Sequence, residues 1–321
     1  QINMGMYYGE ESGLPLYYRV YPGSISDKTH LKYMVADNEF INGKHTRFVM
    51  DRGFYSKENL QYLTQGGYRF VIALPGSLKY CQELVETHSA ELINHSEFRL
   101  GAGLPYGKSY ESTVLGFRMN IHLYYDPEKA LRETIALYEL LEAQENDLKL
   151  MEEPPEKKLH YERFFHINRS KDGKLGFVRN FQAIDAALKA CGFFLIAETD
   201  FKKTTAEILD IYRRRDTIEK SFDDLKNELD MKRLRIHTSE TAQGKVFVSF
   251  LSLIVRSYLL KRLKDYMRKN GLTLRKILLE LDKIKTIQYP GSEDERLLNP
   301  LTKQQREIYE LLELPMPECR G

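Results

Sequence analysis

Short apolar segments that alternate with helical segments constrain the fold of this 321-residue chain more than any other feature. Apolar residues 47–50 stop at Asp51-Arg52-Gly53, a helical pattern follows Ser56, and a second apolar segment occupies residues 68–74. Strand, helix and strand in this order predict an α/β fold with a mixed sheet flanked by helices. Residues 193–197 are apolar again, so the same sheet should resume there.

The segments around this core have other patterns. Residues 2–8 and 14–21 are aromatic and β-prone, and a glycine-containing turn separates them, which predicts a β-hairpin. From residue 204 onward the pattern is mostly helical. We therefore expect four parts: residues 1–74 as the first part of the core, 75–190 as an α+β insertion that packs on its own, 191–270 as the remainder of the core, and 271–321 as a helical C-terminal tail.

Composition narrows the class of protein. The chain has 48 basic and 46 acidic residues, so its net charge of +2 does not by itself indicate a polyanion partner. The three cysteines, Cys81, Cys191 and Cys319, have no metal-binding spacing and are typical of a reducing cytoplasm. The longest apolar run, residues 246–255, is shorter than the ~20 residues that cross a bilayer and predicts a buried helix.

Residues 211–226 carry the most chemical information. On one continuous helix that turns about 100° per residue, Tyr212, Arg215, Glu219 and Lys226 fall within an arc of roughly 60°. Apolar residues fall on the adjoining stripe. The polar stripe should therefore run along the edge of the buried face, where a cleft can form.

These four side chains suit phosphodiester chemistry. A carboxylate can hold a divalent cation, a guanidinium can bind a phosphate through two hydrogen bonds, and a phenol and an ammonium can hold neighbouring phosphates. An alternative interpretation is that Arg215 and Glu219 form an ordinary solvated ion pair and that Lys226 merely faces water, because such pairs are common on helices.

The spacing Y-x2-R-x3-E-x6-K, which these four residues satisfy, resembles the signature around the last catalytic glutamate of bacterial insertion-sequence DDE transposases. The segment Phe48-Val49-Met50-Asp51-Arg52-Gly53 is similar to the strand-end motif that bears the second catalytic aspartate of that family. The resemblance covers nearly the whole chain. The expected insertion corresponds in position to the one that such enzymes carry between the second aspartate and the glutamate.

Asp51 also has a physical rationale of its own. A carboxylate that directly follows a buried strand lies at the edge of a sheet, where the active sites of such folds collect. The alternative for this residue is an ordinary turn aspartate before a glycine. Arg52 and Gly53 are expected to shape the turn, and we assign them no chemistry.

The resemblance implies a ribonuclease H-like core in which three carboxylates bind two Mg²⁺ or Mn²⁺ ions and catalyse cleavage and strand transfer at the ends of an insertion sequence. Asp51 and Glu219 are then expected to be catalytic residues and metal ligands, and Tyr212, Arg215 and Lys226 to bind DNA. The implied partners are double-stranded DNA at the element ends and at the target, and a homodimer on the DNA, without a membrane. The implied location is the bacterial cytoplasm, at the nucleoid.

One feature departs from the family pattern. The first catalytic aspartate of the family lies on a strand upstream of the hairpin, and no residue of this chain occupies that position. The sequence opens at Gln1 within a strand-like pattern. We therefore expect the segment with that aspartate to precede Gln1, so that these 321 residues alone lack one metal ligand and are inactive.

Basic residues downstream of the glutamate are candidates for contacts with the DNA backbone. Lys232, Arg233 and Arg235 form a first cluster, and residues 261–269 contain a second. Each cluster is equally explained as a solvated face. Two further functions stay open: a catalytically inactive, DNA-binding transposase remnant, and a ribonuclease H-like nuclease that cuts DNA without joining strands.

Overall fold

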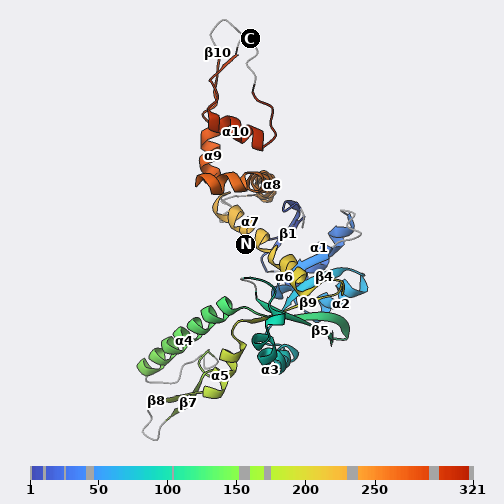
Figure 1. Ribbon diagram of the computed structural model, residues 1–321, viewed down its shortest axis with the longest axis vertical. Helices are drawn as coiled ribbons and strands as arrows, with labels where there is room; N and C mark the ends of the chain where they lie inside the picture. Colours follow the sequence, from blue (N-terminus) through green and yellow to red (C-terminus); the bar gives the residue numbers. More distant parts are fainter. Residues whose placement is uncertain are drawn as a thin grey trace. The chain divides into compact units, whose positions relative to one another are not determined.

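The computed structural model describes residues 2–9, 12–24, 27–40, 47–102, 105–151, 160–169, 175–229, 238–288 and 296–317 (Figure 1). The chain divides into two compact units. Unit 1 contains residues 1–24 and 216–321, and unit 2 contains residues 25–215. This division differs from the four expected parts because the N-terminal hairpin shares its apolar core with the C-terminal helices.

Unit 2 is built on a five-stranded mixed sheet with the strand order β3-β4-β9-β6-β5. β3 pairs with β4 in parallel, and the other neighbours are antiparallel, so β3, β4 and β6 run in the same direction. Their carboxyl ends meet at one edge of the sheet. The strands are β3 (Arg47–Met50), β4 (Arg69–Leu74), β5 (Tyr106–Val114), β6 (Phe117–Tyr125) and β9 (Phe193–Glu198).

Helices flank this sheet. The expected cap of the second helix is present, since the Ser56 hydroxyl accepts a hydrogen bond from the backbone N–H of Asn59. The last helix of the unit packs on the sheet through Ile208 and Ile211, which contact Val71 and Ile196. The predicted α/β class is therefore confirmed, and the arrangement is consistent with a ribonuclease H-like core. The helical elements are α1 (Asp27–Phe40), η1 (Arg52–Phe54), α2 (Lys57–Gln65), α3 (Lys79–Asn94), η2 (Ser96–Phe98) and α6 (Thr205–Arg213).

The described residues between 127 and 190 form a subdomain with a core of its own. Leu141 and Leu148 of α4 (Pro127–Leu150) pack against Phe165 and against Ile184 of α5. In Figure 1 this subdomain lies together as a group of green and yellow-green elements. The expected insertion began at residue 75, but β5 and β6 belong to the main sheet because they pair with β9 through backbone hydrogen bonds. The remaining elements of the subdomain are β7 (Phe165–Arg169), β8 (Leu175–Arg179) and α5 (Phe181–Ala190).

A buried acid, Glu198, joins β9 to the segment that leads into α6. Its side chain is fully buried and accepts hydrogen bonds from the backbone N–H groups of Asp200 and Phe201, the latter at 3.0 Å. Burial by itself would raise the pKa of Glu198, but hydrogen bonds from His122, from these two backbone groups and from Asn120 lower the pKa below its usual value. The carboxylate is therefore held in its ionised form.

Glu198→Gln should lower the free energy of unfolding near neutral pH by about 1–3 kcal/mol, because buried donors lose a charged acceptor. Since folding depresses the pKa of Glu198, its contribution is present above the ordinary carboxyl pKa and is lost as the pH falls through the folded-state pKa. Urea unfolding at a series of pH values should show a steeper loss of stability in acid for the wild type than for the variant. The control is Glu111→Gln, an exposed glutamate paired with Arg118. Equal acid dependence of wild type and Glu198→Gln would contradict this account.

Unit 1 joins the N-terminal hairpin to the C-terminal helices. β1 (Ile2–Tyr8) and β2 (Pro15–Pro22) form the predicted antiparallel hairpin. Met6 of this hairpin packs with Leu225, Phe250 and Leu253. The other elements are α7 (Asp216–Asn227), α8 (Ser239–Asn270), α9 (Leu274–Leu281), β10 (Thr286–Gln288), β11 (Arg296–Leu298) and α10 (Lys303–Leu311). Among the residues that the structure describes, no helix is both long and apolar enough to span a membrane.

Candidate active site

Asp51 lies at the carboxyl edge of the sheet, directly after β3. The buried side chains of Phe48 and Met50 fix the strand that ends there. The Oδ1 atom of Asp51 accepts a hydrogen bond of 2.7 Å from the backbone N–H of Gly53, which caps the short helix η1. The side chain is 45% exposed, so the carboxylate remains accessible to a ligand at the edge of the sheet.

Gly53 positions this carboxylate. It donates the capping hydrogen bond, and a Cβ atom at residue 53 would lie 2.9 Å from Oδ1 of Asp51. The expectation that Gly53 only shapes the turn is therefore incomplete. The signal in the sequence was the spacing of a carboxylate and a glycine two residues apart after a strand, which permits this close approach.

Gly53→Ala should rotate the Asp51 carboxylate and reduce any reaction that depends on it about tenfold or more, because misplacement by an ångström strongly affects catalysis. Thermal unfolding should change little, because the displaced atom belongs to a half-exposed side chain. Gly76→Ala is the matched control, since the space around Gly76 at the end of β4 is open. Mn²⁺ affinity and DNA cleavage rate measure the effect. Equal values for the two alanine variants would argue against a positioning role.

The C-terminal end of α6 brings Arg215 to Asp51. The guanidinium Nη1 of Arg215 lies 3.5 Å from Oδ2 of Asp51, and its side chain is 20% exposed. The same guanidinium lies over the ring of Tyr212, 5.0 Å from the ring centre. Asp51 is distant in the sequence from Tyr212 and Arg215, and the fold brings these three predicted site residues together at one edge of the sheet.

The single helix expected through residues 211–226 is wrong. α6 ends at Arg213, and α7 begins at Asp216. Between them the N–H of Arg215 donates to the carbonyl of Tyr212 at 3.1 Å, an i to i−3 bond that tightens the last turn. No proline or glycine marks this break, so the helical periodicity of the sequence gave no sign of it.

Three consecutive arginines at this break each pair with an acid. Arg213 lies 3.8 Å from Asp126, and Arg214 lies 2.6 Å from Asp210, while Arg215 faces Asp51. The pairs of Arg213 and Arg215 connect the end of α6 to the residues that follow β6 and β3, whereas the Arg214 pair lies within the last turn of α6. Tertiary contacts of this kind compete with continuation of the helix.

Asp126 is a second acid at the same edge, directly after β6. Its Oδ1 atom accepts hydrogen bonds from the N–H groups of Glu128 and Lys129 at 3.0 and 3.1 Å and so caps α4. β4 and β9 separate β6 from β3, which sets these two strands about 14 Å apart across the sheet, and Met50 is level with Ile121, four residues before the end of β6. Asp126 is therefore too far from Asp51 to share one cation with it.

Glu219 and Lys226 lie on α7 in unit 1. Both side chains are exposed, and their spacing of two helical turns places them on one face, beside the half-buried Phe222. The adjoining face of α7 carries Leu225, which packs against Met6 and Phe250.

An ion pair further fixes α7. Asp224 forms an ion pair of 2.9 Å with Arg256 of α8. Burial raises the pKa of Tyr8, on β1 of the same unit, to about 12, so this phenol is neutral at physiological pH. The exposed face with Glu219 thus belongs to a helix that packs through Leu225 in the apolar core of unit 1.

The remaining predicted DNA-binding residues, Lys232, Arg233 and Arg235, lie outside the described residues. In the second basic cluster, the Lys261 ammonium donates to the carbonyl of Ser12 at 2.8 Å, and Arg262 pairs with Glu313. These contacts favour the structural interpretation of the second cluster.

The carboxylates of Asp51 and Glu219 fit a divalent cation in donor chemistry, because hard cations prefer oxygen ligands. The Asp51 side chain is partly exposed, but within the described part of the chain no group of three or more His, Cys, Asp or Glu side chains could hold a metal ion. Asp51 belongs to unit 2 and Glu219 to unit 1. A site with three carboxylates therefore needs a further ligand besides these two.

An accessible carboxylate and a stacked arginine at the carboxyl edge of a mixed sheet define a class of site suited to phosphoryl transfer. The family model described as "Transposase DDE domain" matches residues 1–255, so the chain belongs to the DDE transposase domain family. This family comprises nucleic-acid-cleaving transposases, generally uses divalent metal ions and implies DNA as the partner. No curated protein matches the sequence significantly.

Proposed function

We propose that this protein catalyses metal-dependent cleavage and strand transfer at the ends of an insertion sequence, and that it belongs to the transposase group with the Y-x2-R-x3-E-x6-K signature. The observation that carries this proposal is the ion pair between Arg215 and Asp51. This ion pair connects Arg215, near the start of the glutamate motif, to Asp51 at the end of β3. Such proximity is expected if both motifs contribute to one site at the edge of the sheet. A chance match of either motif gives no reason for such a contact.

Each residue has a role in the proposed reaction. Asp51 and Glu219 would hold Mg²⁺ or Mn²⁺, two ions in the intact enzyme, and the metal would supply Lewis-acid stabilisation of the charge that develops on the phosphate oxygens. Tyr212, Arg215 and Lys226 bind the phosphates of the element end. A guanidinium suits this role because its planar donors match two phosphate oxygens.

The proposed DNA partners are the element ends and the target. Lys232, Arg233 and Arg235 extend the phosphate contacts downstream of the glutamate, where their number sets the salt dependence of binding. A homodimer pairs the two ends of the element. The proposed site of action is the nucleoid of a bacterial cytoplasm.

A strand-transfer assay tests the proposed function. The full-length protein is incubated with Mg²⁺ and with labelled duplexes that carry an element end and flanking DNA, and a supercoiled plasmid serves as target. Joining of the labelled 3′ end to the plasmid, abolished by EDTA, supports the proposal. Cleavage without joining would indicate a nuclease, and binding without cleavage would indicate an inactive remnant. Either of these two outcomes overturns it.

A further inference from the structure

The helix α8 carries an exposed apolar stripe. Five large apolar side chains on it are between 39% and 60% exposed: Phe247, Val248, Leu251, Val255 and Tyr258. At about 100° per residue they fall within an arc of roughly 100°. The sequence predicted that residues 246–255 are buried, and this is correct only for the opposite face, where Phe250 and Leu253 pack against Met6 and Leu225.

A helix that is apolar on both faces normally has a partner on both. The hairpin and α7 cover one face of α8. The exposed stripe extends over about three turns, which makes it more continuous than the scattered apolar residues of an ordinary surface. Another helix is the natural partner for such a stripe, because its residues recur at the three- and four-residue spacing of helix–helix packing.

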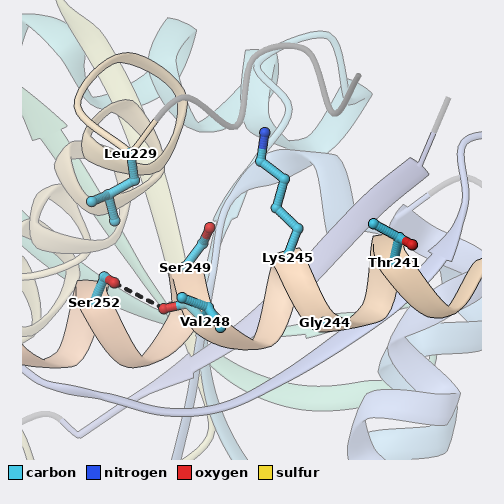
Figure 2. Close-up of a pocket in the computed structure, with 7 residues that line it drawn as sticks. All are labelled: Leu229, Thr241, Gly244, Lys245, Val248, Ser249 and Ser252. Atoms are coloured by element: carbon cyan, nitrogen blue, oxygen red, sulfur yellow. Dashed lines mark hydrogen bonds between the residues drawn. The ribbon is translucent and has the colours of Figure 1, made fainter. Parts of the chain in front are cut away.

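Charged residues of opposite sign lie beyond the two ends of the stripe. Glu240 lies on the same face of α8 toward its N-terminus, and Arg262 lies on that face toward its C-terminus. Gly244, which has no side chain, lies on the stripe and leaves room beside it. A hollow of about 550 Å³ borders the stripe there, and Figure 2 shows Gly244 and Val248 along α8 with Leu229 across the hollow. The lining residues are Leu229, Thr241, Gly244, Lys245, Val248, Ser249 and Ser252.

The stripe of one copy is complementary to the stripe of a second copy that runs in the opposite direction. If two copies of α8 pair in antiparallel fashion about Leu251, residues at equal distances on either side of Leu251 face one another. Phe247 then meets Val255, and Tyr258 meets Gly244. Glu240 meets Arg262, so an acid faces a base at each end of the contact. The ring of Tyr258 in each copy thus faces the hollow beside Gly244 of the other copy.

A parallel pair would lack this complementarity. It would place the two Tyr258 rings against each other, and the hollow beside Gly244 in one copy would face the same hollow in the other. It would also bring the two Arg262 side chains together, and like charges at an interface are unfavourable. Arg262 already pairs with Glu313, but its five N–H donors allow a second carboxylate partner.

We propose that α8 is a homodimer interface, in which two copies of this chain pair antiparallel about Leu251 and Tyr258 of each copy lies over Gly244 of the other. The pairing uses apolar contacts and two ion pairs, and it forms without DNA or metal. It is therefore independent of the proposed strand-transfer activity. Failure of the strand-transfer assay would leave this interface untouched.

The association of the full chain tests the interface. Sedimentation equilibrium without DNA should give a dimer for the wild type at ~100 µM. Leu251→Asp should weaken dimerisation about 100-fold or more, because it places two charges together in an apolar contact. Leu279→Asp is the matched control, since Leu279 is also an exposed leucine, on α9 of the same unit, and should leave the dimer unchanged. A monomeric wild type, or equal weakening by both variants, would overturn the proposal.

Cysteine cross-linking tests the geometry and does not depend on the charged variant folding. In a chain with Cys191→Ser and Cys319→Ser, Leu251→Cys should form an intermolecular disulfide because Leu251 lies on the twofold axis. Val255→Cys should not, because two copies of residue 255 would lie about 12 Å apart along the helices. A mixture of Phe247→Cys and Val255→Cys chains should cross-link again. Equal cross-linking of Leu251→Cys and Val255→Cys, or none in any combination, would rule out the antiparallel pair.

Discussion

Asp51→Asn or Glu219→Gln should each reduce DNA strand cleavage by the full-length protein about 1,000-fold or more, with no loss of folded structure. Each change keeps the shape of the side chain and removes the negative charge that binds a divalent cation. An asparagine at residue 51 retains an oxygen that can accept the capping hydrogen bond from Gly53. The loss should therefore be one of metal binding and chemistry, while the thermal unfolding temperature stays close to that of the wild type.

Asp126→Asn is the matched control for these variants. Asp126 follows a strand at the same edge and faces Arg213 at 3.8 Å, but it lies too far from Asp51 to share a cation. Its replacement should leave cleavage within about threefold of the wild type. Normal nicking by Glu219→Gln, or equal loss in Asp126→Asn, would refute the assignment of the two acids.

A shared cation can also be detected without activity. Fe²⁺ in place of Mg²⁺, with ascorbate and peroxide, cleaves the backbone near the bound ion. Fragments that end near both Asp51 and Glu219 are expected if the two acids bind one ion. Asp51→Asn should abolish both cuts. Cleavage near only one of the two acids would place them in separate sites and remove the basis for the proposed chemistry.

Arg215→Ala should have two opposite effects. The guanidinium lies 3.5 Å from Oδ2 of Asp51, so it competes with a cation for this oxygen, and its removal should tighten Mn²⁺ binding by about three- to tenfold. DNA cleavage should nevertheless fall about 100-fold, because the phosphate loses a bidentate partner. Calorimetric Mn²⁺ titration and cleavage kinetics measure the two effects separately.

Arg215→Lys distinguishes charge from shape. A lysine retains the positive charge, but it lacks the planar fork and stacks less well over the Tyr212 ring, so cleavage should fall to an intermediate rate. Arg213→Ala is the control, because Arg213 pairs with Asp126 at the same edge. Its Mn²⁺ affinity should match that of the wild type. Weaker Mn²⁺ binding in Arg215→Ala would show that Arg215 supports the metal site instead of competing with the ion.

The break between α6 and α7 divides the residues of the signature between the two units. Tyr212 and Arg215 belong to unit 2 with Asp51, whereas Glu219 and Lys226 belong to unit 1. The signature therefore spans the junction of two compact units. In the proposed enzyme, the phosphate-binding arginine is positioned by the sheet, and the metal-binding glutamate is positioned by the hairpin and α8.

Several features of this protein follow from the sequence alone. Apolar runs and their flanking turn residues predicted the hairpin, the strand before Asp51 and the helix that Ser56 caps. Such elements are determined by periodicity and by capping, which act over a few residues. The location of Asp51 at a strand end follows from the same local rules.

The tertiary structure decided the rest. It placed β5 and β6 in the main sheet, because strand pairing joins residues that are distant in the chain. It ended α6 at Arg213, where arginines pair with acids on other elements, and it brought Arg215 to Asp51. It also left one apolar face of α8 exposed. Local periodicity shows which face of a helix is apolar, but only the packing of the whole chain determines whether that face is covered.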